Sequence, residues 1–237
     1  MVKYLRAVLF VIIFLAPSVV FAKSFSGSAT AKSNNNSMAS PITITGSISA
    51  LTTVYGTPSA SSSFTVSGND LLDVIKILAP PGFEVSTDNV NFFSNPNPVT
   101  LGGWLFVPTV PTTTIYVRLS ATASAGTHSG NINITTYTWD VPFPWFFSVN
   151  VPIPTSTVTP APLTITANNT SKTYGTAIAG GTGSAAFTSP GLQNSETIGS
   201  VSIAYGTGAA ANAAVGTYIG SVVPSAATGG SFNPSNY

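Results

Sequence analysis

Short segments in which apolar and polar residues alternate dominate the sequence after its first forty residues. In residues 114–119, T-I-Y-V-R-L, the isoleucine, valine and leucine would face one way and the tyrosine and arginine the other. This is the pattern of a half-buried β-strand. Comparable segments begin at Ile42, Phe64, Val74 and Asn131, and clusters of Gly, Pro, Asn and Asp separate them. No window of 11 residues after residue 22 shows a convincing helical period, so the sequence predicts an all-β sandwich rather than an α/β fold.

The composition supports an extracellular β-protein. Only 5% of the residues are charged, and the chain contains no cysteine. A disordered chain would lack the many Ile, Val, Phe and Tyr residues present here. Stability must therefore come from burial and from the hydrogen bonds of the sheets, without disulfides.

Residues 1–22 have the features of a secretory signal peptide. Lys3 and Arg6 form a basic head, residues 7–15 are an unbroken apolar run, and small residues precede an expected cleavage site after Ala22. The alternative is an uncleaved membrane anchor, but the run is shorter than the roughly 20 residues that a bilayer span needs. We expect a secreted protein whose mature chain has no membrane span.

The charge of the mature chain argues against nucleic-acid binding. Two of the seven basic residues lie in the signal peptide, so five remain against six acidic ones, a net charge of −1. Phosphate backbones are bound by basic patches, and no such patch is present.

Composition shifts divide the mature chain into two modules. Residues 23–40 show no periodicity and are expected to be a flexible leader. The first module spans 41–153, and the second, where alternation resumes at Leu163, spans 163–237. Prolines are dense around residues 154–162, which predicts a semi-stiff linker.

Two motifs occur in the same order in both modules. T-V-Y-G-T at 53–57 corresponds to K-T-Y-G-T at 172–176, and G-T-x-x-G at 126–130 corresponds to the same pattern at 216–220. These echoes predict related tandem modules. We expect Tyr55, Gly56, Tyr174 and Gly175 to be turn residues, with the tyrosine packing on a sheet edge and the glycine permitting a positive φ. A phosphate-binding loop is excluded because Gly183 is followed by Ser184, without the lysine and helix that such loops need.

Residues 162–237 closely resemble the MBG domain. The resemblance is carried by the opening L-T-I-T-A, by K-T-Y-G, by V-G-T-Y and by the final S-N-Y. It implies an immunoglobulin-like β-sandwich of the kind repeated in large bacterial surface proteins. Because S-N-Y normally continues into another strand in that family, the resemblance also implies that the second sandwich is incomplete and the sequence a fragment.

Residues 41–153 are similar to a related immunoglobulin-like module that often accompanies the MBG domain. The matching stretches are Y-G-T-P-S-A-S, P-P-G-F-E-V-S-T-D, I-Y-V-R-L and A-G-T-H-S-G-N-I. His128 departs from the pattern, since such modules usually carry tyrosine there. The segment from Trp139 to Phe147 also departs, since a short turn is usual. The resemblance implies neighbouring repeats of the same longer chain as partners.

The sequence contains few residues that could carry out catalysis. His128 is the only histidine, and a lone histidine in the place of a packing tyrosine is expected to be structural. Asp70, Asp73 and Asp88 lie at turns, where ordinary hydrogen-bonding duty is the expectation and calcium binding is the alternative. We expect no catalytic residues, no cofactor and no metal site.

The segment W-D-V-P-F-P-W-F-F at residues 139–147 has two interpretations. Its prolines exclude a regular central strand, and its five aromatic residues exceed what one strand needs. Trp139, Phe143 and Trp145 could form an exposed platform for a glycan or a partner protein, with Trp104 nearby. In the other interpretation Phe146 and Val149 enter the core and the remaining rings cap the sandwich.

These observations give a leading and a rival hypothesis. The leading one is a non-catalytic, exported bacterial surface protein, a structural stalk or adhesin-type scaffold of tandem β-sandwiches with an unknown extracellular protein or glycan as its partner. The rival is a carbohydrate-binding module that uses the aromatic segment at 139–147.

Overall fold

The computed structural model describes residues 40–102, 108–140 and 143–237. The predicted signal peptide and leader, and Trp104, lie outside these residues. The described part belongs to one compact unit that spans residues 39–237. Within it, no helix has the length and apolar character needed to cross a membrane.

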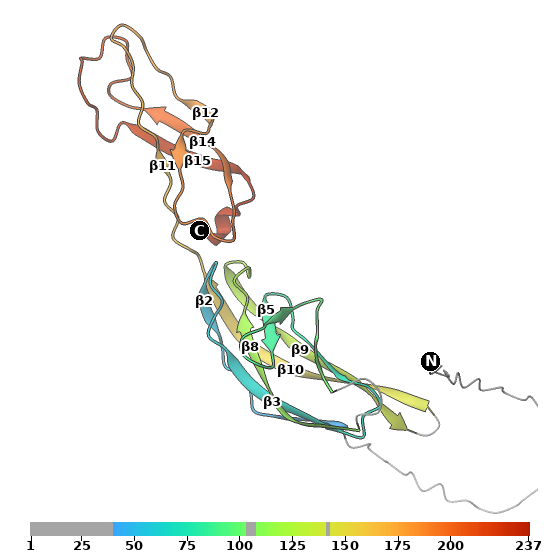
Figure 1. The fold of residues 1–237 in the computed structure, drawn as a ribbon. Helices are drawn as coiled ribbons and strands as arrows, with labels where there is room; N and C mark the ends of the chain where they lie inside the picture. The colour runs from blue at the N-terminus through green and yellow to red at the C-terminus, as the bar shows by residue number, and fades with distance from the viewer. Residues whose placement is uncertain (1–39, 103–107, 141–142) are drawn as a thin grey trace, which may run out of the picture. The chain divides into compact units, whose positions relative to one another are not determined.

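Strands make up nearly all the regular structure, which confirms the all-β prediction (Figure 1). The one helical element described is a single 3₁₀ turn, η1 (Pro234–Asn236). The strands are β1 (Ile42–Thr45), β2 (Thr52–Val54), β3 (Ser62–Asn69), β4 (Ile75–Leu78), β5 (Phe83–Ser86), β6 (Phe93–Ser94), β7 (Val99–Leu101), β8 (Thr109–Leu119), β9 (Gly126–Asp140), β10 (Phe143–Thr159), β11 (Thr166–Ala167), β12 (Gly181–Ser184), β13 (Phe187–Thr188), β14 (Ile198–Tyr205) and β15 (Val222–Gly230).

The first module contains two five-stranded sheets that share one core. Their strand orders are β1-β3-β8-β5-β6 and β2-β10-β9-β4-β7. Both sheets send alternate side chains into the core, and the fully buried ones include Phe64, Val66, Ile115 and Val117 from the first sheet and Ile75, Ile77, Ile132 and Ile134 from the second. Fully burying a side chain of this size stabilises the fold by about 1.5–3 kcal/mol.

Strand β8 shows how the alternation directs the fold. Ile115, Val117 and Leu119 are completely buried, as the period of two predicted. On the other face, Arg118 lies opposite Glu84 of β5, and its Nε atom is 2.9 Å from Oε2 of that residue. The guanidinium carbon also lies 3.7 Å from the centre of the Phe92 ring, so the charge is held by a carboxylate and an aromatic face.

The predicted linker at 154–162 is wrong for its first six residues, because β10 continues to Thr159. The register shifts between Ile153 and Ser156, so Pro154 falls in an irregularity of the ladder, where its missing N–H is tolerated. Beyond it, residues 157–159 pair in parallel with β2. Val158 is buried, so this stretch belongs to the first module's core.

The second module has two smaller sheets, β11-β13 and β12-β14-β15. Its buried apolar side chains are Val201 and Ile203, both on the central strand β14. Val215 and Ile219 are almost fully exposed. Apolar burial among residues 163–237 is therefore far smaller than in the first module.

Candidate functional site

The aromatic segment forms the end of the hairpin made by β9 and β10. Phe143 pairs with Asp140, Trp145 with Thr138 and Phe146 with Tyr137. Pro144 lies in this ladder, but β2 pairs only with the far end of β10. At Pro144, β10 is therefore an edge strand, where a residue without an N–H is acceptable.

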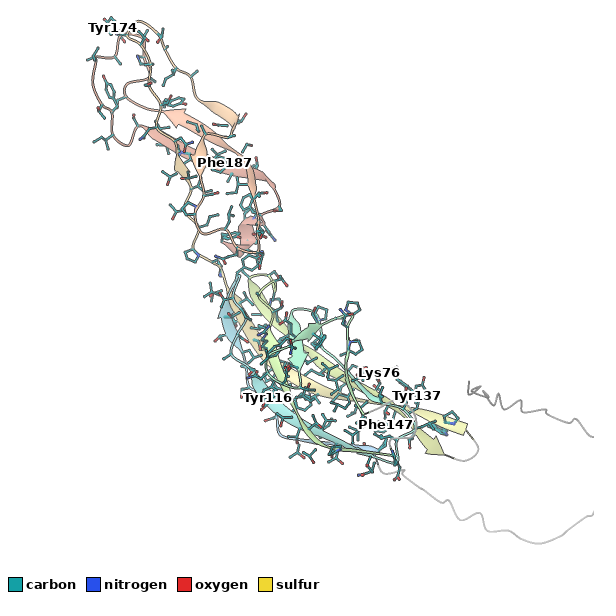
Figure 2. All side chains as sticks on the ribbon, in the orientation of Figure 1. Lys76, Tyr116, Tyr137, Phe147, Tyr174 and Phe187 are labelled. Atoms are coloured by element: carbon teal, nitrogen blue, oxygen red, sulfur yellow. The ribbon has the colours of Figure 1, made fainter. Side chains whose placement is uncertain are left out.

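Alternation along β10 decides which rings enter the core. Phe147, which is labelled in Figure 2, packs against the core, and so does Val149. Phe146, by contrast, is exposed. The interpretation that placed Phe146 in the core was therefore wrong by one residue. Phe146 instead contacts Tyr137 of β9, with ring centres 5.5 Å apart in an edge-to-face arrangement.

Trp145 is the described member of the predicted platform. Its side chain is 61% exposed. Neighbouring residues of a strand point to opposite faces, so Trp145 and Phe146 do not lie on one surface. The side chains of Trp139 and Phe143 lie outside what the structure describes, and a platform that includes them stays a prediction.

The predicted turn residues Tyr55, Gly56, Tyr174 and Gly175 mark the sequence repeat, and we call them the marker residues. Tyr55 makes contacts that reach far beyond a turn. It is 5% exposed, and its hydroxyl donates a hydrogen bond of 2.8 Å to Oε1 of Glu196. The hydroxyl of Tyr237 donates to the other carboxylate oxygen of Glu196. The two tyrosine rings lie edge to face with centres 5.6 Å apart. One carboxylate thus joins a tyrosine from each module, and we call the contacts among Tyr55, Glu196 and Tyr237 the joint.

Burial raises the pKa of Tyr237 to about 12, and the hydrogen bond to Glu196 adds to the rise. Both effects favour the neutral phenol, because a phenolate would be desolvated and would face a carboxylate. The phenol therefore remains a hydrogen-bond donor to Glu196 over the whole neutral pH range.

Backbone and amide groups complete the joint. Asn236 is buried, its Oδ1 accepts from the N–H of Ala125 at 2.9 Å, and its carbonyl accepts from Ala161 at 2.8 Å. Nδ2 of Asn194 donates to the carbonyl of Ala121 at 3.2 Å. The contacts with Ala125 and Ala121 pair polar groups of residues 190–237 with the end of the first module that carries Tyr55, and the contact with Ala161 pairs Asn236 with the linker.

Gly56 lies where the joint leaves no room for a side chain. Its φ is +88°, and a Cβ atom there would lie 2.7 Å from Cβ of Gln193. Gly175 has a similar φ of +92°, but a Cβ atom there would meet nothing within 4 Å. The two marker glycines thus share a backbone conformation and differ in what covers them.

The tyrosine-glycine turns have the same hydrogen-bonding pattern in both modules. Three backbone bonds recur, from N–H to carbonyl: Thr57 to Val54 (3.0 Å), Gly56 to Ala121 (3.1 Å) and Ser59 to Leu119 (3.2 Å) in the first module, and Thr176 to Thr173 (3.1 Å), Gly175 to Ala211 (2.9 Å) and Ile178 to Ala209 (3.1 Å) in the second. The sequence echo is therefore a repeat of local structure.

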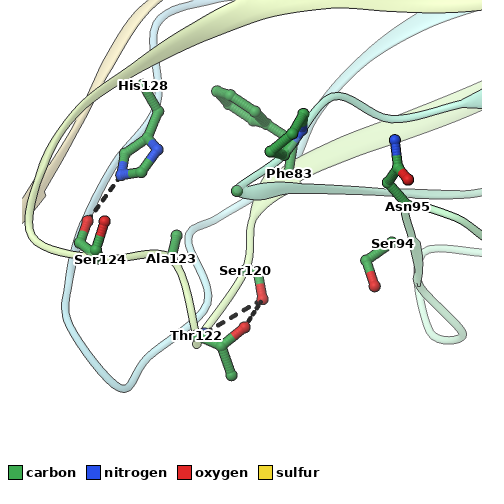
Figure 3. Close-up of a pocket in the computed structure, with 10 residues that line it drawn as sticks. Phe83, Ser94, Asn95, Ser120, Thr122, Ala123, Ser124 and His128 are labelled. Atoms are coloured by element: carbon green, nitrogen blue, oxygen red, sulfur yellow. Dashed lines mark hydrogen bonds between the residues drawn. The ribbon is translucent and has the colours of Figure 1, made fainter.

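His128 occupies the position that Tyr218 has in the second module. Its Nε2 atom lies 2.7 Å from the carbonyl of Ser124, and the Tyr218 hydroxyl donates to the equivalent carbonyl of Ala214 at the same distance. The imidazole also lies edge to face with Phe83. It lines an open depression of about 500 Å³ whose other walls are apolar, hydroxyl, amide and backbone groups (Figure 3). The lining therefore offers no carboxylate to orient the ring for acid–base chemistry.

The acidic turn residues make local hydrogen bonds. Oδ1 of Asp88 accepts from the N–H groups of Val90 and Asn91 and from the hydroxyl of Ser86, at 2.8–2.9 Å. These bonds, the one from the Asn91 backbone first, hold the pKa of Asp88 well below its usual range. Asp73 accepts from the N–H of Val74. Among the residues described, no three His, Cys, Asp or Glu side chains gather as metal ligands would.

Sequence reasoning missed Glu196, the residue that links the two tyrosines. It is the one acidic residue of 163–237, and Lys172 is the one basic residue. An isolated charge in an otherwise neutral module is a signal that could have identified it, because such a residue is seldom buried without a partner.

Comparison with known proteins gives a family for the C-terminal part of the chain. No curated protein and no solved structure matches the chain. The immunoglobulin-like character expected for residues 41–153 therefore stays a prediction, although their β-sandwich architecture is observed. Residues 163–237, which carry the second tyrosine-glycine turn and Glu196, match the family model described as the MBG domain (YGX type), as their motifs predicted.

Proposed function

We propose that the protein is a non-catalytic, exported bacterial surface protein in which tandem β-sandwich modules act as a stalk or adhesin-type scaffold. The match to the MBG domain, a domain associated with bacterial surfaces, supports this setting. The signal-peptide pattern of residues 1–22 supports export.

The observation that carries the proposal is the joint. A scaffold must transmit position or force from one module to the next, and this requires contacts between modules. Tyr55 and Tyr237 share the Glu196 carboxylate, and hydrogen bonds to a charged acceptor contribute about 1.5–3 kcal/mol each. The edge-to-face pair of tyrosines adds about 0.5–1.5 kcal/mol.

Export is tested by expressing the whole chain in a bacterium and measuring the mass of the product found outside the cytoplasm. We expect a polypeptide that begins at Lys23, because cleavage should follow Ala22. A chain that stays in the cytoplasm with residues 1–22 attached would contradict the proposal. A variant with Ala22 replaced by a bulky residue is the matched control and should keep its leader.

Carbohydrate binding is the second candidate function. The exposed indole of Trp145 on one face of the hairpin and the exposed pair of Phe146 and Tyr137 on the other face favour it. Soluble polysaccharides should be titrated while tryptophan emission is followed, with Trp145→Ala as the control. A saturable change that the control lacks would support this function, and an unchanged spectrum with every glycan would leave the scaffold as the better account.

A further inference from the structure

The end of the second module that carries Tyr174 repeats a surface that is already occupied in the first module. In the first module, this surface consists of the Tyr55–Gly56 turn and the loop 120–125. Four residues of the second module contact this surface. Glu196 accepts a hydrogen bond from Tyr55, and Gln193 packs over Gly56. Asn194 donates to the Ala121 carbonyl, and Asn236 accepts from the Ala125 N–H. The turn and the loop that make these contacts have backbone hydrogen bonds that recur in the second module.

The equivalent groups of the second module are uncovered. Tyr174 is 63% exposed, against 5% for Tyr55, and Val215, which corresponds to Ala125, is 91% exposed. The space over Gly175 is empty where Gln193 covers Gly56. The Ala211 carbonyl accepts from Gly175, as the Ala121 carbonyl accepts from Gly56. We call this surface, the Tyr174–Gly175 turn with the loop 210–215, the receptor end.

The receptor end also carries the only basic residue of the second module. Nζ of Lys172 donates to the carbonyls of Thr176 (3.0 Å) and Ala210 (2.8 Å). In the first module, the hydroxyl of Thr53 makes the equivalent bond to Thr57. The receptor end therefore has the turn geometry of the first module together with a positive charge, where the turn of the first module has the neutral Thr53.

The charges of the second module are segregated between its two ends. Glu196, its only acidic residue, contacts Tyr237, whereas Lys172 lies on the turn of Tyr174. Figure 2 places Tyr174 at the end of the module away from the C-terminus marked in Figure 1. Opposite charges at opposite ends favour head-to-tail association, because each end then attracts the unlike end of the next module.

We infer that the receptor end binds a further module of the same kind, through a module end that presents a carboxylate and amides as Q-N-S-E (193–196) and N-Y (236–237) do here. The carboxylate would accept from the Tyr174 hydroxyl, an amide oxygen would accept from the Val215 N–H, and an amide N–H would donate to the Ala211 carbonyl. This inference rests on the proposed scaffold function and names the surface through which the array continues.

The test uses the mature chain, residues 23–237, labelled with ¹⁵N as the receptor. Its own Glu196 is engaged by Tyr55, so the donor must be a chain whose Glu196 end is free. An unlabelled chain with Gly56→Glu and Tyr174→Ala serves, because a side chain at position 56 overlaps Gln193 and the second change removes the donor's own receptor end. A second donor with Tyr55→Ala and Tyr174→Ala opens the joint by a different route.

We expect saturable shifts of the Gly175, Ala211 and Val215 amide signals as donor is added to about 1 mM, the effective concentration that a short tether provides. Adding Glu196→Ala to the donor should weaken binding roughly tenfold or more, since a charged hydrogen bond is lost. A labelled receptor with Tyr174→Ala should show no saturable shift.

Unchanged signals with both folded donors at this concentration would overturn the inference. Shifts that survive both Glu196→Ala in the donor and Tyr174→Ala in the receptor would overturn it too, since they would place the contact elsewhere. Neither result would affect the proposed function if the Ala125 amide signal of the labelled chain keeps the chemical shift of its hydrogen-bonded state. Loss of that contact in the labelled chain would instead count against the joint on which the proposed function rests.

Discussion

The hydroxyl of Tyr55 donates a 2.8 Å hydrogen bond to Oε1 of Glu196, a residue 141 positions later in the chain. Tyr237 donates to the other oxygen, so the carboxylate is shared by a tyrosine from each module. Tyr55 belongs to the repeated turn motif Y-G-T, and Tyr237 belongs to the final S-N-Y. The structure shows that the motifs meet one another.

Replacing Glu196 should loosen this contact. Glu196→Ala leaves the buried Tyr55 hydroxyl without its acceptor, and an unsatisfied buried donor costs about 1–3 kcal/mol. Urea unfolding should show a loss of that size. Glu196→Gln keeps a hydrogen-bond acceptor without the charge and should give a smaller loss of stability. Equal stability of the wild type and Glu196→Ala would contradict the hydrogen bond between Tyr55 and Glu196.

Tyr237 should ionise late in an alkaline titration. Its pKa is raised to about 12 from an ordinary value of 10.0, because burial and Glu196 favour the neutral phenol. The folded state therefore binds the proton more tightly than the unfolded state, so this contribution to stability is complete below pH 10 and is lost as the pH rises toward 12. Absorbance of tyrosinate at alkaline pH should show one late component that is missing in Tyr237→Phe. An unchanged curve for that variant would show that the late component belongs elsewhere.

Asp88 should keep its charge far into the acid range. Its carboxylate accepts three hydrogen bonds at Oδ1 and one from Asn91 at Oδ2, which lowers its pKa. The contribution of this turn to stability is present above the ordinary carboxyl pKa and disappears as the pH falls through the lowered value. Carboxyl ¹³C shifts measure the titration directly. Ser86→Ala removes one donor and should raise the pKa of Asp88, and an unaltered titration in that variant would count against the hydrogen-bond explanation.

Alanine at the two marker glycines should have unequal effects. Gly56 and Gly175 both have positive φ, which costs a residue with a side chain about 1–2 kcal/mol. Gly175→Ala should show only this strain, because the space around it is empty. Gly56→Ala must also displace Gln193, so its free energy of unfolding should fall further. Equal losses in urea unfolding would mean that Gln193 does not cover Gly56 in solution.

Two aromatic residues of β10, Phe147 and Trp145, provide a matched pair. Phe147 packs against the core and Trp145 is exposed. Phe147→Ala should therefore lower the free energy of unfolding by about 2 kcal/mol or more, whereas Trp145→Ala should stay within about 0.5 kcal/mol of the wild type. The reverse order in thermal or urea unfolding would contradict the burial of the Phe147 ring and the exposure of Trp145.

The periodic segments predicted the strands of the first module well, because burial on one face of a strand produces a regular alternation of apolar and polar residues in the sequence. Residues 115–119 follow it completely. The pattern was misleading at Phe146, where several consecutive apolar residues hide the alternation and only the pairing with Tyr137 decides the facing. It was also misleading at Pro154, where a local irregularity lets the strand continue past a residue that normally ends one.

The joint could not be predicted from local pattern. Tyr55 and Glu196 are brought together only by the folds of two modules, and a turn motif gives no information about what lies across from it. The isolated charges of the second module, Lys172 and Glu196, were the one available hint. Their significance depends on which ends of the module they occupy, and this is a property of the fold.

The most direct test of the scaffold account is a ¹⁵N relaxation measurement on the mature chain, residues 23–237. If Tyr55, Glu196 and Tyr237 hold the modules together, amides of residues 41–159 and 163–237 should report one common rotational diffusion tensor. The double variant Glu196→Ala, Tyr237→Phe should then give two separate correlation times. Independent tumbling of the two modules in the wild-type chain would contradict the account.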